Sequence, residues 1–212
     1  MIRKRAARGC RRPCSSGKVN VTVSIANIET VRALRKVRQI REYTDEPVSQ
    51  DDLNELLEVA RWSGSSQNTQ PWHFIVITDK DALRTIGEQR PNIGWVGDAP
   101  LAIALVLNGA NPPSEYYDEG RVTERLLIAA RELGLGAGTA WIGEEPQQAA
   151  IKKLLGVPQD RILRSVVVIG HPQPGATHKL GRKTSGRKPL DEVVSFGSFG
   201  NATAATSEGS AS

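Results

Sequence analysis

The chain has 212 residues and a formal net charge of +5; 39% of its residues are hydrophobic and 24% are charged. This balance is typical of globular domains, so it excludes a collagen-like or wholly disordered chain and favours one domain with its own core. The longest apolar runs, residues 99–107 and 166–169, are far shorter than the ~20 residues that a membrane-spanning helix needs, so no membrane span is predicted.

The first 20 residues form a basic arm that differs from the rest of the chain. They hold seven of the 28 basic residues and no acidic one, which leaves 21 basic against 23 acidic residues elsewhere. Because the charge lies in an arm and not on a face of the body, nucleic-acid binding is not predicted. We expect residues 1–28 to lie outside the fold. An upstream start codon, a disordered arm and a targeting segment are the open interpretations.

The only two cysteines, Cys10 and Cys14, also lie in this arm, four residues apart and without a nearby histidine. This spacing does not complete a tetrahedral metal site, so no metal is expected. A body without cysteine excludes a cysteine nucleophile and suits a reducing compartment. The sequence therefore predicts a cytoplasmic protein.

The body opens with a helical repeat. Val31, Leu34, Val37 and Ile40 are spaced as on one helical face, which predicts a helix that ends near Tyr43.

Helices and strands then alternate. The patterns predict a helix from Ser49 with a capping box at Asp52, a polar loop at 63–70, a strand at 72–78 and a short helix near 81–88. They next predict a buried strand at 101–107, a helix from about 114 to 133, a glycine-rich strand at 136–142, a helix opened by Pro146, and a strand at 163–169. This order predicts an α/β domain whose sheet has helices on both faces.

The chain's end contains little to bury. After Phe199 only small and polar residues follow, so we expect 200–212 to be a flexible tail and the folded domain to span 29–199. Phe196 and Phe199 are interpreted either as an arm that reaches a partner chain or as a hydrophobic plug that closes the fold.

Several known site motifs are absent. The glycines at 134, 136 and 138 do not match GxGxxG and follow a helix instead of opening one. The stretch 175–184 departs from the P-loop spacing, and no two of the three histidines share a helical face. Dinucleotide-fold, P-loop and zinc-hydrolase chemistry are therefore not predicted.

Four scattered segments carry groups suited to a polar ligand. They are Arg38–Arg41, the hydroxyl- and amide-rich run 65–72, the glycine-rich run 134–143, where backbone amides can approach a ligand closely, and the basic pair Arg187 and Lys188. Taken alone, the first is more simply a solvated helix face.

In this order the segments resemble the FMN-dependent nitroreductase family. The most specific element is SSQNTQPWHFI at 65–75, and the paired arginines, the ELGLGAG run and the late RKPL fall where that family has them. The resemblance covers about residues 29–194. It implies an α+β fold with a central, mostly antiparallel sheet of four to five strands, and a homodimer with FMN at the interface.

Two departures mark a divergent member. The family's opening Arg-Arg-Ser-x-Arg is VRQIR at residues 37–41, and the usual proline before the serine pair is Gly64. One phosphate-directed arginine and one hydroxyl are therefore missing, so the substrate does not follow from better-known members.

The resemblance also implies the cofactor-binding residues. They are Arg38, Gln39, Ile40, Arg41, Ser65, Ser66, Asn68, Thr139, Ala140, Trp141, Arg187 and Lys188. The four basic residues would bind the FMN phosphate through charge-assisted hydrogen bonds, and Arg41 is alternatively placed near the pyrimidine edge. The loop residues would contact the ribityl chain and ring edge, and a backbone amide among residues 139–141 would face flavin N5.

The implied reaction is a two-electron transfer from NADH or NADPH to a nitroaromatic, quinone or similar flat acceptor by a ping-pong cycle. Because the cofactor carries the redox step, no catalytic side chain is expected. Segments 89–97 and 109–117 are the candidates to cover the flavin and select the acceptor. The alternatives are other flavin chemistry on the same fold, such as dehalogenation or flavin breakdown, a non-catalytic flavin-binding module, and nucleic-acid binding through the basic arm.

Overall fold

The computed structural model describes residues 25–176 and 186–201, with side chains from Glu29 onward. The expectations for the basic arm and both cysteines fall outside these residues, as do nearly all those for the tail. Helix α1 (Ile25–Lys36) belongs to a separate unit that ends at Val37 and is described by itself. None of the helices in the described part of the chain is both long and apolar enough to cross a bilayer.

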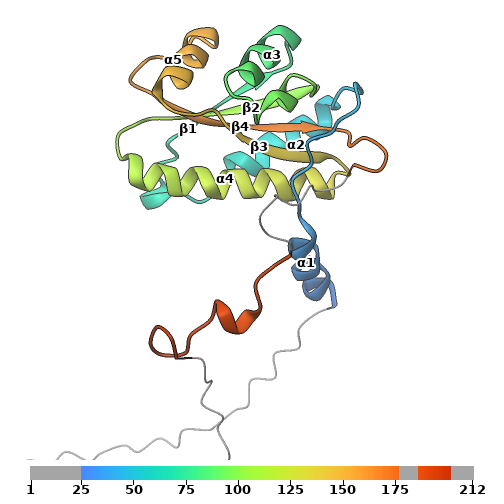
Figure 1. The fold of residues 1–212 in the computed structure, drawn as a ribbon, viewed down its shortest axis with the longest axis vertical. Helices are drawn as coiled ribbons and strands as arrows, with labels where there is room; N and C mark the ends of the chain where they lie inside the picture. The colour runs from blue at the N-terminus through green and yellow to red at the C-terminus, as the bar shows by residue number, and fades with distance from the viewer. Residues whose placement is uncertain (1–24, 177–185, 202–212) are drawn as a thin grey trace, which may run out of the picture. The chain divides into compact units, whose positions relative to one another are not determined.

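The body is built on a four-stranded sheet in which each neighbouring pair is antiparallel (Figure 1). Its order is β1 (Trp72–Ile77), β2 (Leu101–Leu107), β4 (Ile162–Gly170) and β3 (Gly136–Trp141). β1 and β3 are therefore the two edges. The prediction of a mostly antiparallel sheet of four to five strands is confirmed.

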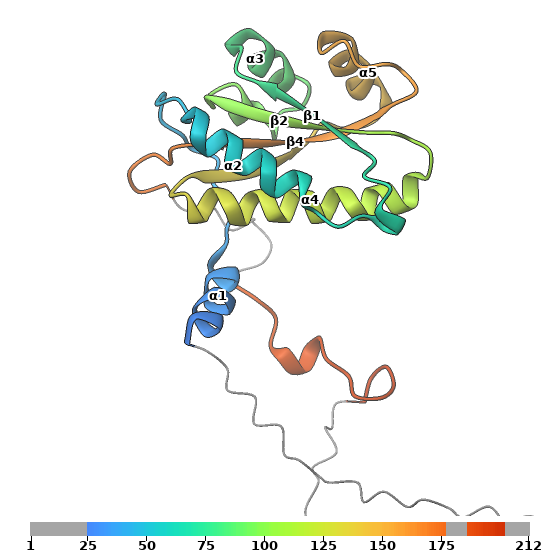
Figure 2. The same cartoon turned by 180° about the vertical axis from the view of Figure 1, so that it is seen from behind.

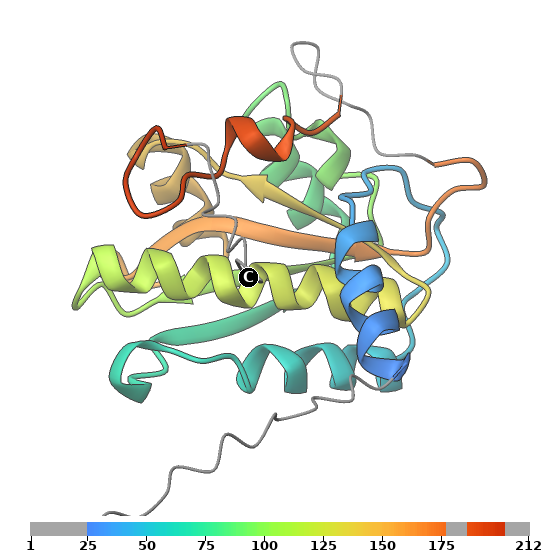
Figure 3. The ribbon, with the colours of Figure 1, turned by 90° about the horizontal axis from the view of Figure 1, so that it is seen from below.

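Two pairs of helices cover the sheet, one pair on each face. Helices α2 (Gln50–Arg61) and α4 (Pro112–Glu132) lie on one face, and α3 (Lys80–Glu88) and α5 (Glu145–Leu154) lie on the other (Figures 1 and 2). Figure 3 shows α4 running along the sheet with α2 beside it. The sequence prediction of helices on both faces is confirmed.

The core lies between these layers, and β2 is its centre. All seven β2 residues are buried because both faces of the strand are covered, which explains its uninterrupted apolar sequence. Residues of α4, such as Val122 and Leu126, are fully buried, as are Leu83 and Ile86 of α3. Burying a side chain of this size contributes roughly 1.5–3 kcal/mol, so each of these residues stabilises the packing of its helix on the sheet.

Local sequence signals set where the helices begin and end. Ser49 caps α2 because its Oγ accepts from the Asp52 amide at 3.0 Å and donates to the Asp52 carboxylate at 2.7 Å. Asp79 caps α3 in the same way, through the Ala82 amide at 2.8 Å. After α4, Gly134 has φ +78°, a left-handed conformation that glycine adopts without strain and that ends the helix.

The Ser49 cap has a measurable effect on stability. Ser49→Ala leaves the Asp52 amide in the first turn of α2 without its side-chain acceptor, so we expect the free energy of unfolding to fall by about 1 kcal/mol. Urea denaturation at fixed protein concentration measures this. Gln50→Ala is the control, because Gln50 is exposed and contacts only Asn54 by side chain, at 3.0 Å. An equal loss in both variants would contradict the capping role.

The predicted C-terminal end of the first helix is wrong. α1 stops at Lys36, and residues 37–42 continue without helical structure instead of extending the helix to Tyr43. The Ile40 amide donates to the Ala137 carbonyl at 2.8 Å, and Tyr43 forms an isolated antiparallel bridge with Pro172. These distant backbone partners, which a helical repeat does not reveal, replace the helical hydrogen bonds.

Candidate functional site

The segment Arg38–Arg41 lies along the free edge of β3, where two glycines make room for it. A Cβ on Gly136 would lie 2.9 Å from the Ile40 side chain, and one on Gly138 would lie 2.7 Å from the Ile40 carbonyl oxygen. No other residue type leaves this space, so the glycine-rich run places the backbone of one predicted segment against another.

Polar and aromatic groups meet at this edge. The Oε1 of Gln39 accepts from the Thr139 amide and from the Arg41 guanidinium, both at 3.3 Å. The same guanidinium lies 5.3 Å from the centre of the Trp95 ring. We call Gln39, Ile40, Arg41, Trp95 and Thr139 the β3 cluster. It unites four of the predicted site residues with one that no motif singled out, although Trp95 lies in the segment 89–97 that was expected to cover the flavin.

Tyr43 holds the backbone of Ile40, a member of the β3 cluster, in place. Its hydroxyl donates to the Ile40 carbonyl at 2.5 Å and lies 3.3 Å from the Val168 carbonyl. Burial raises the pKa of the Tyr43 phenol well above its usual value, and the nearby charge of Arg41 offsets this only in part. The phenol therefore stays protonated and remains a donor across the working pH range of most proteins.

Of the three predicted backbone amides in β3, two face the open edge of the sheet. Thr139 directs its amide to the open edge, whereas the Ile142 amide donates to Arg164 of β4 at 2.8 Å. Because amides alternate between the two sides of a strand, the Ala140 amide faces β4, and only the Thr139 and Trp141 amides face outward. The Trp141 carbonyl is bonded by Arg90 at 3.1 Å, and that guanidinium lies 4.4 Å from the centre of the Trp141 ring.

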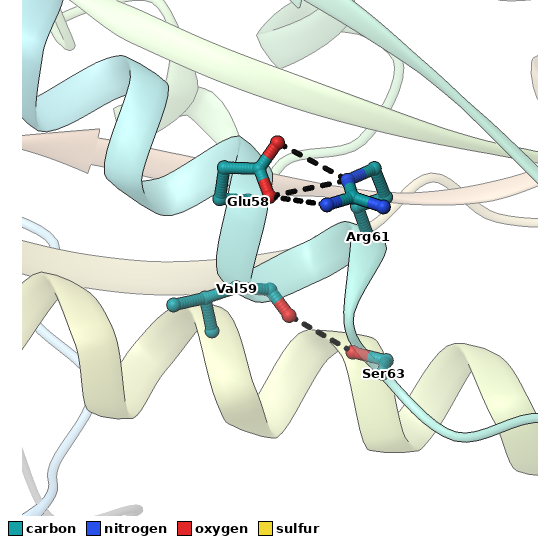
Figure 4. A network of polar contacts seen from close by, with 4 residues as sticks. All are labelled: Glu58, Val59, Arg61 and Ser63. Carbon is teal, nitrogen blue, oxygen red and sulfur yellow. Dashed lines mark hydrogen bonds and ion pairs between the residues drawn. The ribbon is translucent and has the colours of Figure 1, made fainter.

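The predicted loop begins at the end of α2. Figure 4 shows the Arg61 guanidinium paired with Glu58, and Ser63 Oγ donating to the Val59 carbonyl at 3.4 Å. Hydrogen bonds from Arg61 lower the pKa of Glu58 below its ordinary value. This pair is exposed, so it marks the surface at the helix end and does not belong to the polar loop that follows.

The loop at 65–70 is strained. Three residues that are not glycine have left-handed backbones: Gln67 at φ +51°, Asn68 at φ +57° and Gln70 at φ +47°. Such conformations cost of order 1–3 kcal/mol each and cluster at binding and active sites. Ser65 Oγ closes the loop by accepting from the Gln70 amide at 2.9 Å, and the Ser66 amide donates to Asp118 at 3.0 Å.

The predicted site residues thus fall into separate groups. Ser65, Ser66 and Asn68 precede β1, at one edge of the sheet, whereas the β3 cluster lies at the opposite edge. Arg187 and Lys188 lie in the segment 186–201, which contains the short turn Leu190–Glu192 and is described by itself; both side chains are exposed.

No group of three or more histidine, cysteine or acidic side chains in the described residues is arranged to hold a metal ion. Buried carboxylates do occur in α4, at Glu115, Asp118 and Glu119, but each contacts a different segment. Asp118 was missed by the sequence analysis, because an acidic residue in a helix carries no signal that it will face a loop 52 residues away.

The chain resembles proteins of one known family. The Nitroreductase family model matches residues 34–90. A protein of Archaeoglobus fulgidus, provisionally named an NADH dehydrogenase/NAD(P)H nitroreductase, is 33% identical over 161 residues, which cover 68% of this chain and 86% of that one. An iodotyrosine deiodinase of Nematostella vectensis is 27% identical over 202 residues, which cover 78% of this chain and 74% of that one.

A solved structure gives the same result at the level of the fold. A provisionally assigned nitroreductase from Desulfovibrio desulfuricans, in complex with FMN, superimposes with a TM-score of 0.67 at 28% identity and covers 77% of this chain and 94% of its own. The chain belongs to the nitroreductase family.

Proposed function

We propose that the chain is an FMN-dependent oxidoreductase that passes two electrons from NAD(P)H to a nitroaromatic, quinone or similar flat acceptor in a ping-pong cycle. The observation that carries this proposal is the β3 cluster, in which a guanidinium, a carboxamide and an outward backbone amide converge on a glycine-lined strand edge. We further propose that the FMN-binding domain spans residues 29–199.

The residues at the two edges fit FMN. Arg38 and Arg41, with Arg187 and Lys188 from the later segment, supply the positive charge that a phosphate requires. Thr139 has a buried Oγ1 without a hydrogen-bond partner, so the cluster has hydrogen-bonding capacity that its own side chains do not use. Bound FMN would supply the hydride acceptor and the two-electron transfer, so the protein's part is binding, orientation and electrostatics.

The strained loop supplies the other half of the proposed site. Ser65, Ser66 and Asn68 offer hydroxyl, amide and carbonyl groups of the kind that match a ribityl chain and a flavin edge. Because this loop and the β3 cluster lie at opposite edges of one sheet, we propose that two chains together complete each FMN site, the loop of one chain facing the cluster of the other. The protein is then a homodimer. We also propose that it is cytoplasmic, because the sequence after Cys14 contains no cysteine, as suits a reducing compartment.

Two exposed aromatic side chains support the dimer. Trp62 is 71% exposed and Tyr117 is 68% exposed, and each lies beside an arginine: Arg61 at 5.1 Å and Arg121 at 4.7 Å from the ring centre. Aromatic residues and arginine are enriched at protein interfaces. Light scattering of the purified chain is expected to give twice the monomer mass.

The function is tested by absorption spectroscopy of the purified protein, followed by anaerobic titration with NADH and NADPH. We expect a flavin spectrum that one of the nucleotides bleaches and that a nitroaromatic or quinone restores. A colourless protein that also fails to bind added FMN would contradict the proposal.

A substitution in the β3 cluster locates the site. Arg41→Ala removes a cation from the proposed flavin contact, so we expect the FMN dissociation constant to rise by about 10- to 100-fold, because hydrogen bonds to charged groups contribute ≈ 1.5–3 kcal/mol. Titration of the apoprotein by flavin fluorescence measures this. Arg84→Ala is the matched control, because Arg84 lies on α3 in an exposed pair with Asp81 at 2.7 Å. Equal weakening in both variants would mean a general charge effect and no site at the cluster.

Reductive dehalogenation is the second candidate, favoured by the likeness to iodotyrosine deiodinase over most of the chain. Steady-state assays with nitroaromatic, quinone and halogenated aromatic acceptors distinguish the two. A rate with the halogenated compounds that exceeds the others would favour this candidate over the first.

A further inference from the structure

Helix α4 holds the segment before the strained loop through three side chains. Arg125 donates to the Trp62 carbonyl at 2.9 Å, Arg121 donates to the Gly64 carbonyl at 3.4 Å, and Asp118 accepts from the Ser66 amide at 3.0 Å. Residues at this spacing share one face of a helix. Successive turns of α4 therefore bind alternate residues of the segment 62–66.

Asp118 differs from the two arginines because it is buried. Its side chain is 2% exposed, and its second carboxylate oxygen receives the Arg121 guanidinium at 3.3 Å. A buried carboxylate is tolerated when a cation and hydrogen-bond donors compensate it. Here one of those donors is the backbone of a loop residue, so the loop's position and the satisfaction of the buried charge depend on each other.

The contact lies where the strained loop begins. The left-handed residues Gln67, Asn68 and Gln70 follow Ser66 directly, and the far end is tied back by the Gln70 amide on Ser65 Oγ. Left-handed conformations are unfavourable for residues other than glycine and persist only where the surrounding structure enforces them. Asp118 is the buried group that supplies this constraint at the start of the loop.

We propose that Asp118 is a positioning residue: with Arg121 it sets the loop geometry in which Ser65, Ser66 and Asn68 meet the flavin, without itself touching the cofactor. The consequence for FMN rests on the function proposed above, whereas the ordering of the loop does not. This difference allows the two claims to be tested separately.

The same helix provides a matched control. Glu119 follows Asp118 directly, and its side chain is also buried, at 5% exposed, but it faces β4, where it accepts from Ser165 Oγ at 2.5 Å and from Arg164 at 2.6 Å. Glu119→Gln perturbs a buried carboxylate of α4 without touching the loop. Any effect that it shares with an Asp118 variant is a general effect on the helix.

The first experiment measures amide hydrogen exchange in the full-length apoprotein. In Asp118→Ala we expect the amides of Ser66 and Gln70 to exchange on the order of tenfold faster, while β1 amides stay protected, because the loop opens locally without global unfolding. Glu119→Gln is expected to leave both loop amides unchanged. Unchanged exchange at Ser66 and Gln70 in Asp118→Ala would overturn the positioning role.

The second experiment measures FMN binding by fluorescence and the flavin midpoint potential. We expect Asp118→Ala to weaken FMN binding by about 30-fold, Asp118→Asn, which keeps an oxygen acceptor, to recover to within about fivefold, and Glu119→Gln to stay within about twofold. A merely structural role would lower thermal stability in the Asp118 and Glu119 variants alike and leave the potential unmoved, which would overturn the proposal.

The proposal remains testable if Asp118→Ala does not fold or if the wild-type chain binds no FMN. If Asp118→Ala does not fold, Arg121→Met replaces it in the exchange experiment. Arg121 is half-exposed, and its loss removes both the contact with Gly64 and the ionic partner of Asp118. The same faster exchange at the Ser66 amide is expected, and unchanged exchange there would contradict the positioning role. A wild-type chain that bound no FMN would overturn the proposed function alone, since exchange in the apoprotein still decides whether Asp118 orders the loop.

Discussion

Replacing Gly138 by alanine is expected to lower the free energy of unfolding by about 3 kcal/mol, the upper part of the range for overpacked sites, and to abolish tight FMN binding. The added Cβ would lie 2.7 Å from the Ile40 carbonyl oxygen and 3.1 Å from the Trp95 ring. That oxygen cannot move aside, because it accepts from the Tyr43 hydroxyl at 2.5 Å and the Ile40 amide is bonded to β3 at 2.8 Å. The segment must leave the strand edge.

Urea denaturation and FMN titration at fixed protein concentration measure the two effects. Gly94→Ala is the control, since a Cβ there meets nothing within 4 Å and the residue lies in the same segment as Trp95. We expect it to change stability by less than about 0.5 kcal/mol. A Gly138→Ala protein as stable as this control would show that the segment does not pack on β3 as described.

Removing Arg164, the partner of the buried Glu119 carboxylate, is expected to lower the free energy of unfolding by a similar amount. Arg164→Met leaves the Glu119 carboxylate buried with only the Ser165 hydroxyl as donor, so we expect a loss of about 3 kcal/mol, at the low end for a broken buried pair. The low end applies because the Arg164 side chain is 30% exposed. Methionine keeps part of the contact with the Tyr116 ring, whose centre lies 3.5 Å from the guanidinium.

The double variant Arg164→Met with Glu119→Gln is the sharper measurement. Without a charge to compensate, it is expected to regain most of the loss, to within about 1 kcal/mol of Glu119→Gln alone. A double-mutant cycle by urea denaturation gives the coupling between the two residues. Strictly additive losses would mean that the pair is not coupled and that the Arg164 variant acts through packing alone.

The helices and strands were predictable because the hydrophobic pattern and the capping residues of each lie within its own stretch of sequence. The apolar run of β2 requires a strand covered on both sides, and the Ser49 and Asp52 pair fixes the start of α2 within one residue. The antiparallel pairing came from the resemblance, and the strand order was not predicted, since periodicity does not tell which strand pairs with which.

The candidate site was predictable only as segments. The sequence placed Arg38 and Arg41 at a helix end, because Val37 and Ile40 continue a helical spacing; in the structure Ile40 instead fits the space left by Gly136 and Gly138. The backbone hydrogen bond between Ile40 and Ala137, which are 97 residues apart in the sequence, outweighed the local helix propensity. The contributions of Trp95 and Asp118 depend on the same kind of distant contact, which a single sequence does not reveal.

The strand order also limits how this protein acquires its structure. The central pair, β2 and β4, joins residues about 55 to 68 positions apart, from Leu107 with Ile162 to Leu101 with Ile169. Pairings so distant along the chain slow folding, because the loop entropy is lost before the contacts form. On the ribosome, β2 can pair with β1 as soon as it emerges, but its other edge stays open until α4, β3, α5 and β4 have been synthesised. An apolar strand with an unpaired edge is prone to aggregation during this interval.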